Sequence, residues 1–184
     1  MKLLKAFACC LLLACLTACE ERVTEINTVT AKELYDKATG TYVGNIMVDN
    51  QPHAVSVTIG NDFTVTSLPT KPILKEVFTD NTALAEALAS AAEATFKAPT
   101  DNMSVLGIYV LLTMVTSDLV FPVTVGGRTE NVEASIAPYA EVNTLSNELS
   151  LHMEVKALYY DGHAYDMSDK RITYSIDIAN KIIQ

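Results

Sequence analysis

Alternating apolar and polar residues recur along most of the chain and predict paired β-strands. The clearest alternation covers residues 148–156. One face of this run holds Leu149, Leu151, Met153 and Val155, and the other holds polar and charged side chains. Such a pattern is typical of an antiparallel sheet with one face in the core and the other in water. We therefore expect Leu151 in the core, and His152 and Glu154 in contact with solvent.

Further strands are predicted at 40–48, 53–59, 63–68, 119–125, 129–136 and 171–179. The pairs Gly126-Gly127 and Asp161-Gly162 suit tight hairpin turns between strands. In the last strand, the period of two places Ile172, Tyr174, Ile176 and Ile178 inward. The stretch 105–115 is apolar on both faces and fits either a central strand or a buried helix. Its Val, Ile and Tyr content favours the strand.

Two segments have helical patterns instead. Residues 31–38 form a short predicted helix, for which Thr30 is a suitable N-cap. A helical insert is predicted at roughly 70–97, and its second helix runs from Ala83 to about Lys97 after the capping segment Asp80-Asn81-Thr82. The fold class is therefore mainly β (α+β). We expect an antiparallel sandwich or a partly closed barrel of about eight strands, in one β-rich domain over residues 30–184.

The N-terminus has the pattern of a secretory signal peptide. Lys2 and Lys5 precede an apolar run that ends at Ala18, as in the basic and apolar regions of such peptides. The run is too short to cross a hydrocarbon core, which takes roughly 20 residues. We expect residues 1–18 to be removed during export.

The end of this segment, Leu16-Thr17-Ala18-Cys19, resembles the lipobox of bacterial lipoproteins. The resemblance implies that Cys19 is acylated and becomes the first residue of the mature chain, with residues 19–29 as a tether. Two or three acyl chains give a stable membrane anchor. Glu20 and Glu21 resemble the surface-export signal of lipoproteins from the Bacteroidota. This favours the cell surface slightly over the periplasmic face of the outer membrane.

Two resemblances concern the body of the protein. The signal, the acidic neighbours and the small β-rich domain together resemble uncharacterised lipoproteins of gut Bacteroidota. In addition, Gly40-Thr41-Tyr42 after a short helix is similar to the entry of lipocalin barrels, although Tyr42 stands where those proteins have Trp. The second resemblance implies a barrel that holds a small apolar ligand in an internal cavity.

Charge and cysteine content exclude several classes of function. The chain has 13 Lys and Arg against 22 Asp and Glu, for a net charge of −9. Nucleic-acid binding needs clustered cations, so we expect no nucleic-acid partner. All four cysteines, Cys9, Cys10, Cys15 and Cys19, lie in the signal peptide or at its end. The mature chain would have no free thiol, disulfide or thiolate metal site.

The sequence also lacks the motifs of nucleophile elbows, dinucleotide-binding and phosphate-binding loops, zinc proteases and EF-hands. We therefore expect a protein that is not an enzyme and that uses no cofactor. His53 and His152 fall on predicted strands and need no functional explanation.

The best candidate for a binding site is the turn after the strand at 148–156. We predict Tyr160, His163 and Tyr165 as its ligand-binding residues, since exposed tyrosines beside loops are frequent contact residues. The period of two from Val155 places Tyr159 inward and Tyr160 outward. A weaker hypothesis is a cation site formed by Asp161, Asp166 and Asp169, whose spacing differs from that of calcium-binding loops.

These observations favour a lipid-anchored, non-enzymatic binding module at the outer membrane or cell surface, with a protein or a glycan as its partner. The alternative is a lipocalin-like carrier of a small apolar ligand. A continuous apolar cavity inside the barrel would favour the carrier. The sequence does not define the oligomeric state.

Overall fold

The computed structural model describes residues 31–183. The chain divides into two compact units, residues 1–37 and 38–184. Residues 31–38 are helical, as predicted, whereas the proposed cap Thr30, the signal peptide and Cys19 lie outside the described residues. None of the helices within residues 31–183 has the length and apolar content needed to cross a membrane.

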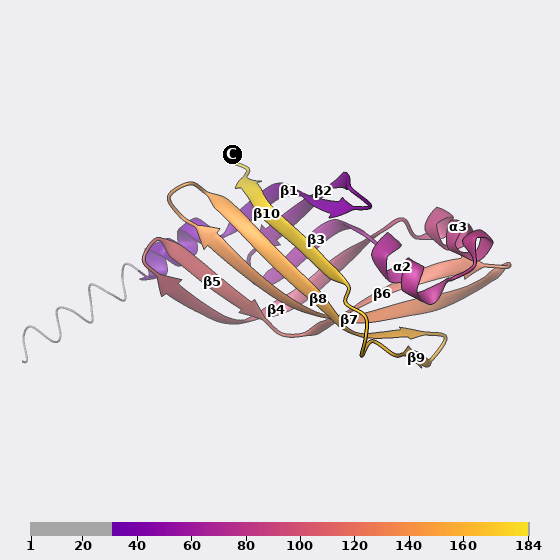
Figure 1. Ribbon diagram of the computed structural model, residues 1–184. Coiled ribbons are helices and arrows are strands. Elements are labelled where there is room, and N and C mark those ends of the chain that lie inside the picture. Colours follow the sequence, from indigo (N-terminus) through magenta and orange to yellow (C-terminus); the bar gives the residue numbers. More distant parts are fainter. Residues whose placement is uncertain (1–30, 184) are drawn as a thin grey trace, which may run out of the picture. The chain divides into compact units, whose positions relative to one another are not determined.

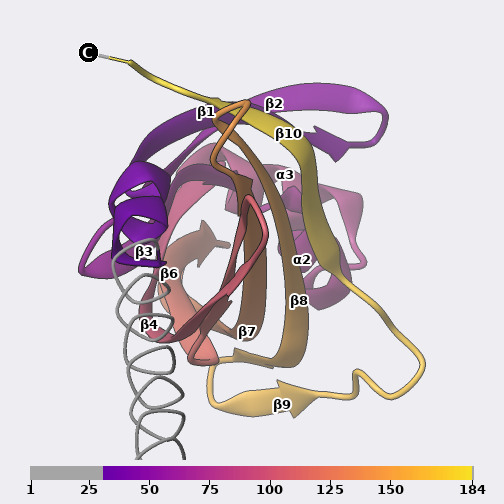
Figure 2. The ribbon, with the colours of Figure 1, turned by 90° about the vertical axis from the view of Figure 1, so that its left-hand side faces the viewer.

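The second unit is an antiparallel β-barrel. The strands are β1 (Gly40–Val48), β2 (Gln51–Ile59), β3 (Asp62–Pro69), β4 (Glu93–Leu106), β5 (Tyr109–Met114), β6 (Ser117–Val125), β7 (Arg128–Asn143), β8 (Glu148–Tyr160), β9 (His163–Tyr165) and β10 (Thr173–Lys181). In the described part of the chain, eight of them close a ring in the order β1-β2-β3-β4-β5-β7-β8-β10. Figure 2 shows this ring from one end. The mainly β fold is confirmed, and the barrel is fully closed.

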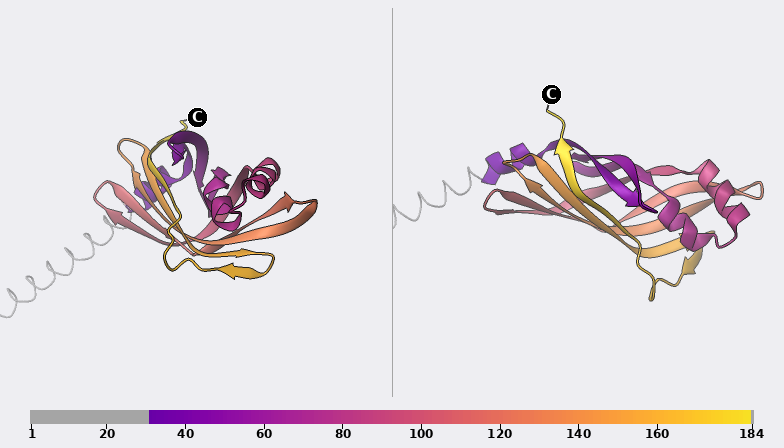
Figure 3. Two further views of the ribbon diagram at one scale, coloured as in Figure 1. Left: turned by 45° about the vertical axis from the view of Figure 1, so that its right-hand side comes forward. Right: turned by 45° about the horizontal axis from the view of Figure 1, so that its top comes forward.

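One wall of the barrel extends beyond the ring. The long strand β7 pairs with β5 through its C-terminal part and with β6 through its N-terminal part, so β6 continues the line of β5. β9 pairs only with the last residues of β8. Strands β6, β7, β8 and β9 therefore form a flared sheet at one end, and helices α2 and α3 lie at this end (Figures 1 and 3).

The apolar stretch 105–115 is not a single strand. It contains the end of β4, a turn at Gly107-Ile108 and β5, with Leu106 opposite Tyr109. Gly107 has a φ of 64°, a backbone conformation that glycine adopts without a steric penalty. The prediction of strand was correct, but the hairpin was missed because Gly107 is embedded among strongly apolar residues.

Apolar side chains line the inside of the barrel. Large inward-facing residues with at most 1% exposure include Tyr42, Ile46, Phe63, Leu68, Phe96, Leu112, Ile136, Leu149 and Tyr174. The alternation predicted for residues 148–156 is confirmed, since Leu149, Leu151, Met153 and Val155 are all buried and His152 is exposed. Apart from the tyrosines, Thr70 is the only polar residue that is buried in the described part of the chain.

β-bulges in β8 and β10 reverse side-chain orientations that the sequence pattern predicted. In β8, Val155 pairs with Ile136 and Ala157 with Ser135, so Lys156 is an extra residue. In β10, two residues between Ile176 and Ala179 face one residue of β8. An extra residue shifts the period of two by one position. Consequently Ile178 is 58% exposed and Ala179 is buried, contrary to the prediction.

The helical insert is shorter than predicted. It comprises α2 (Lys71–Val77) and α3 (Asn81–Ser90), and the Asp80 carboxylate accepts hydrogen bonds from two backbone amides of the first turn of α3, which confirms the cap. Residues 91–97 do not continue the helix. Phe96 lies in β4 opposite Val65 of β3, so strand pairing outweighs the helix propensity of the alanine-rich segment.

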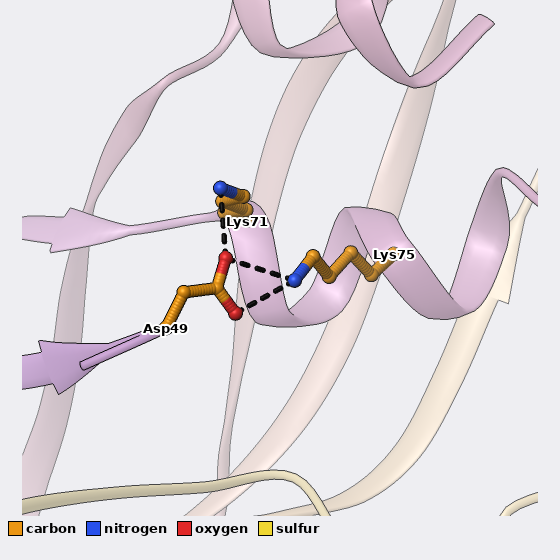
Figure 4. A network of polar contacts seen from close by, with 3 residues as sticks. All are labelled: Asp49, Lys71 and Lys75. Carbon is orange, nitrogen blue, oxygen red and sulfur yellow. Dashed lines mark hydrogen bonds and ion pairs between the residues drawn. The ribbon is translucent and has the colours of Figure 1, made fainter. Parts of the chain in front are cut away.

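An ion-pair cluster connects the insert to the barrel. Asp49, in the β1–β2 turn, lies 2.8 Å from the Lys71 amine and 2.7 Å from the Lys75 amine on α2 (Figure 4). Hydrogen bonds from both lysines lower the pKa of the Asp49 carboxyl to about 2. At the far side of the insert, the Glu86 carboxylate accepts a 2.6 Å hydrogen bond from the amide of Gly126 in the β6–β7 turn.

Candidate functional site

The predicted binding loop is a hairpin that projects from the barrel wall. Its turn, Asp161-Gly162, has positive φ values of 49° and 71°, and β9 pairs with β8 through Tyr159 opposite Ala164 and Tyr160 opposite His163. Both turn residues suit the type of tight turn that the sequence predicted. Figure 3 shows β9 lying apart from the ring of strands.

A hollow of about 330 Å³ lies beside this hairpin. We call it the hairpin hollow, and it is lined by residues 156–159 of β8 and by residues 164–168 of β9 and the following loop. Tyr159, Tyr165 and Met167 form its aromatic and apolar part, and Lys156 contributes an ammonium group. The hollow is open to solvent, so it suits contact with a side chain or sugar of a larger partner better than enclosure of a small molecule.

Of the two adjacent tyrosines, Tyr159 faces this hollow. Tyr159 is 39% exposed, and the preceding Leu158 is fully buried. Tyr160 packs instead against Phe78 at the end of α2, with ring centroids 5.0 Å apart at 72°. The predicted orientations of the two tyrosines were therefore wrong, because the bulge at Lys156 shifts the alternation by one residue.

Tyr160 links the hairpin to the helical insert. Burial raises the pKa of Tyr160 above its usual value, and the Glu130 and Asp161 carboxylates add to the rise. The edge-to-face geometry with Phe78 is one that aromatic pairs prefer. The structure thus places Tyr160 where it positions the hairpin and places Tyr165 in the hollow itself.

His163 and the three aspartates do not converge. His163 is exposed, and its Nδ1 donates to the backbone carbonyl of Asp161 over 2.8 Å. Asp166 accepts a 2.9 Å hydrogen bond from the amide of Ser168, and hydrogen bonds from Ser168 lower the pKa of its carboxyl. Within residues 31–183, no three His, Cys, Asp or Glu side chains are grouped in a way that would hold a metal ion.

Ion pairs hold the edges of the hairpin hollow. Lys156 lies 2.5 Å from Glu154, which also approaches Arg171 at 3.6 Å. The Lys156 hydrogen bond is the largest influence that lowers the pKa of Glu154. Lys170 pairs with Glu76 of α2 at 2.6 Å. The loop that follows β9 is therefore held both to the barrel wall and to the insert.

Two other hollows lie on the outer face of β7, β8 and β10. One, of about 300 Å³, contains Tyr139 and a His152–Ser175 hydrogen bond of 3.2 Å. The other, of about 190 Å³, contains Tyr109 and the carboxylates of Glu141 and Glu148. They share residues at the β10 bulge. No sequence pattern predicted either hollow, because the bulge that contributes to their lining is a property of strand pairing.

The fold and this surface define a small, closed, antiparallel β-barrel with an external hairpin. The chain belongs to the family described as a domain of unknown function (DUF4840), which matches residues 37–160. No curated protein and no solved structure matches the chain. The matched residues end at Tyr160, so β9, the loop after it and the closing strand β10 follow the matched region.

Proposed function

We propose that this protein is a lipid-anchored bacterial lipoprotein of the outer membrane, displayed at the cell surface, whose barrel is a non-enzymatic binding module. In this proposal Cys19 bears the acyl chains and the hairpin hollow contacts a protein or glycan partner. The lipobox resemblance supports the anchor, and the acidic residues after Cys19 support surface display.

The observation that best supports a binding module is the contrast between the inside and the outside of the barrel. Inside, the inward positions are occupied by buried apolar side chains. Outside, the hairpin hollow places two tyrosines, a methionine and an ammonium group together. Tyrosine and methionine are enriched at protein interfaces, and an aromatic ring with nearby donors also suits a sugar ring.

Mass spectrometry tests the anchor. The protein extracted from membranes should begin at an acylated Cys19, and a Cys19→Ser variant should leave the membrane fraction. Protease treatment of intact cells should degrade the wild-type protein if it is displayed at the surface. An unmodified mature N-terminus at another residue would refute the anchor, and full protection in intact cells would refute surface display.

Photo-crosslinking in intact cells tests the binding surface. A crosslinking amino acid at Tyr159 should capture a partner, and Tyr165→Ala should reduce that capture. Tyr139 is the matched control, because it is a similarly exposed tyrosine on the outer face of the barrel. If crosslinking occurs from Tyr139 and not from Tyr159, the hollow around Tyr139 is the binding surface and the proposed site is wrong.

One observation favours the alternative of a ligand carrier. The Tyr174 hydroxyl is buried in the barrel and has no hydrogen-bond partner among residues 31–183. An internal ligand with an acceptor group would satisfy it. Saturable binding of an apolar fluorescent probe to the wild-type protein, weakened by Tyr174→Phe, would support the carrier. Absence of saturable binding would favour the external module.

A further inference from the structure

One end of the barrel has a cluster of exposed apolar side chains on neighbouring turns. Leu106 and Ile108 lie at the β4–β5 turn, Leu145 lies in the β7–β8 turn, and Ile182 follows β10. Leu106 is 67% exposed and Leu145 is 78% exposed. We call these four residues the apolar rim. Large apolar side chains clustered on exposed turns mark a surface that contacts a partner or a membrane.

Backbone hydrogen bonds hold the segments of the rim side by side. The amide of Thr144 donates to the carbonyl of Ile108 over 3.0 Å, which joins the two turns. The amide of Lys181 donates to the carbonyl of Asn147 over 3.0 Å, and that of Ile182 donates to the carbonyl of Thr41 over 2.8 Å. The rim is thus a continuous edge that runs from β4–β5 to the start of β1.

The rim segments are uncharged. Residues 106–109, 144–147 and 182–183 include no Asp, Glu, Lys, Arg or His. The opposite end of the barrel, where α2 and α3 lie (Figure 1), has charged side chains in every corresponding segment. These are Asp49 in the β1–β2 turn, Lys71 and Lys75 in α2, Glu86 in α3 and Arg128 after the β6–β7 turn. The turns that carry the rim are therefore better suited to contact with lipid than the opposite end of the barrel.

The chain also enters the barrel at the rim end. β1 begins at Gly40, beside Ile182, and only 18 residues separate Cys19 from Ala38. If Cys19 is acylated, the chain runs from the acyl chains to this end of the barrel, and the charged end and the hairpin hollow lie at the opposite end.

We propose that the apolar rim inserts shallowly into the lipid interface of the membrane that holds the Cys19 acyl chains. The inference rests on the proposed lipid anchor, because four side chains give weak binding without one. Glu148, the first residue of β8, accepts a 2.7 Å hydrogen bond from Ser146. This carboxylate limits insertion to the turns themselves. Tyr109, beside the rim, suits the headgroup region, where tyrosine is enriched.

Site-specific fluorescence on the acylated mature protein, which begins at Cys19, tests this inference. If Cys19 is acylated, its sulfur is blocked, so Leu145→Cys introduces a single reactive thiol for an environment-sensitive dye. Met47→Cys is the matched control, since Met47 is 60% exposed near the opposite end of the barrel. The labelled proteins are reconstituted in vesicles of phosphatidylethanolamine and phosphatidylglycerol, with and without brominated phosphatidylcholine as a quencher.

We expect the dye at position 145 to shift its emission to the blue and to lose emission with the brominated lipid. The dye at position 47 should show neither change. Leu106→Cys should behave like Leu145→Cys, which guards against an effect of one labelling position. Because the rim is uncharged, the shift should not depend on salt, unlike the binding of basic patches to anionic lipid.

The failures of the two proposals are distinguishable. Acylated protein in the vesicles with no quenching at 145 or 106 would overturn the rim contact and leave the anchor intact. Equal quenching at 47 would overturn the specific orientation. A blue shift without lipid quenching that disappears on dilution would show that a second copy of the chain covers the rim. Protein that lacks acyl chains and stays out of the membrane fraction would overturn the anchor and the rim contact together.

Discussion

At the scale of single residues, the two buried tyrosines of the barrel differ in how their hydroxyl groups are satisfied. Tyr42 donates a 2.7 Å hydrogen bond to the carbonyl of Ala38, whereas the Tyr174 hydroxyl has no partner in the described part of the chain. Burial raises the pKa of both phenols, that of Tyr42 to about 12. Both therefore remain neutral at physiological pH, and the difference between them is one of hydrogen bonding.

This difference predicts opposite effects of the same substitution. Tyr42→Phe should lower the free energy of unfolding by about 1 kcal/mol, because a buried hydrogen bond is lost and the Ala38 carbonyl is left without it. Tyr174→Phe should leave stability unchanged or raise it slightly, because it removes an unsatisfied buried hydroxyl. Urea denaturation of both variants measures the contrast. A clear loss on Tyr174→Phe would show that its hydroxyl has a partner, such as a buried water molecule.

The Asp49 cluster predicts a stability change that depends on pH. The lowered pKa of Asp49 means that the folded state favours the ionised carboxylate. The stabilisation is therefore present above the unfolded pKa of about 4 and is lost as the pH falls toward the folded value of about 2. Asp49→Asn should lower the Tm slightly at pH 7, by no more than about 3 °C for exposed ion pairs. The Tm difference between variant and wild type should shrink as the pH falls toward about 2 and disappear below it, and a difference that stays undiminished there would refute the cluster.

At the scale of strands and helices, the hydrophobic pattern predicts which segments are strands better than it predicts which of their side chains point inward. The strands at 40–48 and 148–156 and the turns at Gly126-Gly127 and Asp161-Gly162 were all confirmed. Their patterns are local and strong. The bulges in β8 and β10 could not be predicted, because an extra residue is defined by the pairing of two strands distant in sequence.

The errors at the candidate site have the same physical origin. One bulge at Lys156 exchanges the orientations of Tyr159 and Tyr160, so the sequence pointed to the correct hairpin and to the wrong tyrosine. The helix was extended past Ser90 for a similar reason. The segment that contains Phe96 has helical composition, but its pairing with β3 determines its structure. In each case a tertiary contact outweighs a local preference.

Before the bulge, the side chains of β8 have the predicted inward and outward orientations. This predicts that substitutions on the two faces differ sharply in their effect on stability. Leu151 is 3% exposed, so Leu151→Ala should cost on the order of 2–5 kcal/mol of unfolding free energy. Glu154→Gln should change it by no more than about 1 kcal/mol, because its ion pairs with Lys156 and Arg171 are at the surface. Denaturant melts of the two variants decide this. A larger loss on Glu154→Gln would mean that the two faces of the strand are exchanged.

At the scale of the whole molecule, closure of the barrel depends on a narrow seam. Among the described residues, β1 and β10 pair at Tyr42–Lys181 and Val43–Asn180, and one further backbone hydrogen bond joins Ile182 to Thr41. β10 follows the residues that match the family. Just beyond these pairs, Gly44 faces the β10 bulge. The bulge brings Ala179 inward in place of Ile178, and the absence of a side chain at Gly44 leaves room for it.

Gly44→Ala should therefore strain the seam. A Cβ at this position would lie 2.8 Å from Ala179 Cβ and 3.1 Å from its Cα, so backbone atoms of β10 would have to move. Overpacking of this kind typically costs about 1–3 kcal/mol. The matched control is Gly60→Ala, where the nearest atom would be 4.0 Å away. That substitution should be neutral or slightly stabilising, since neither glycine has a positive φ and alanine restricts the unfolded chain.

Urea denaturation and hydrogen exchange of the amides of β10 measure the effect together. Gly44→Ala should lower the unfolding free energy and increase exchange at Asn180 and its neighbours in β10, which pair with β1. Strands β2 and β3 should keep their protection, because they pair with strands other than β10. Equal stability of the Gly44→Ala and Gly60→Ala variants would mean that β1 and β10 are not in close contact. The eight strands would then form an open sheet along this edge.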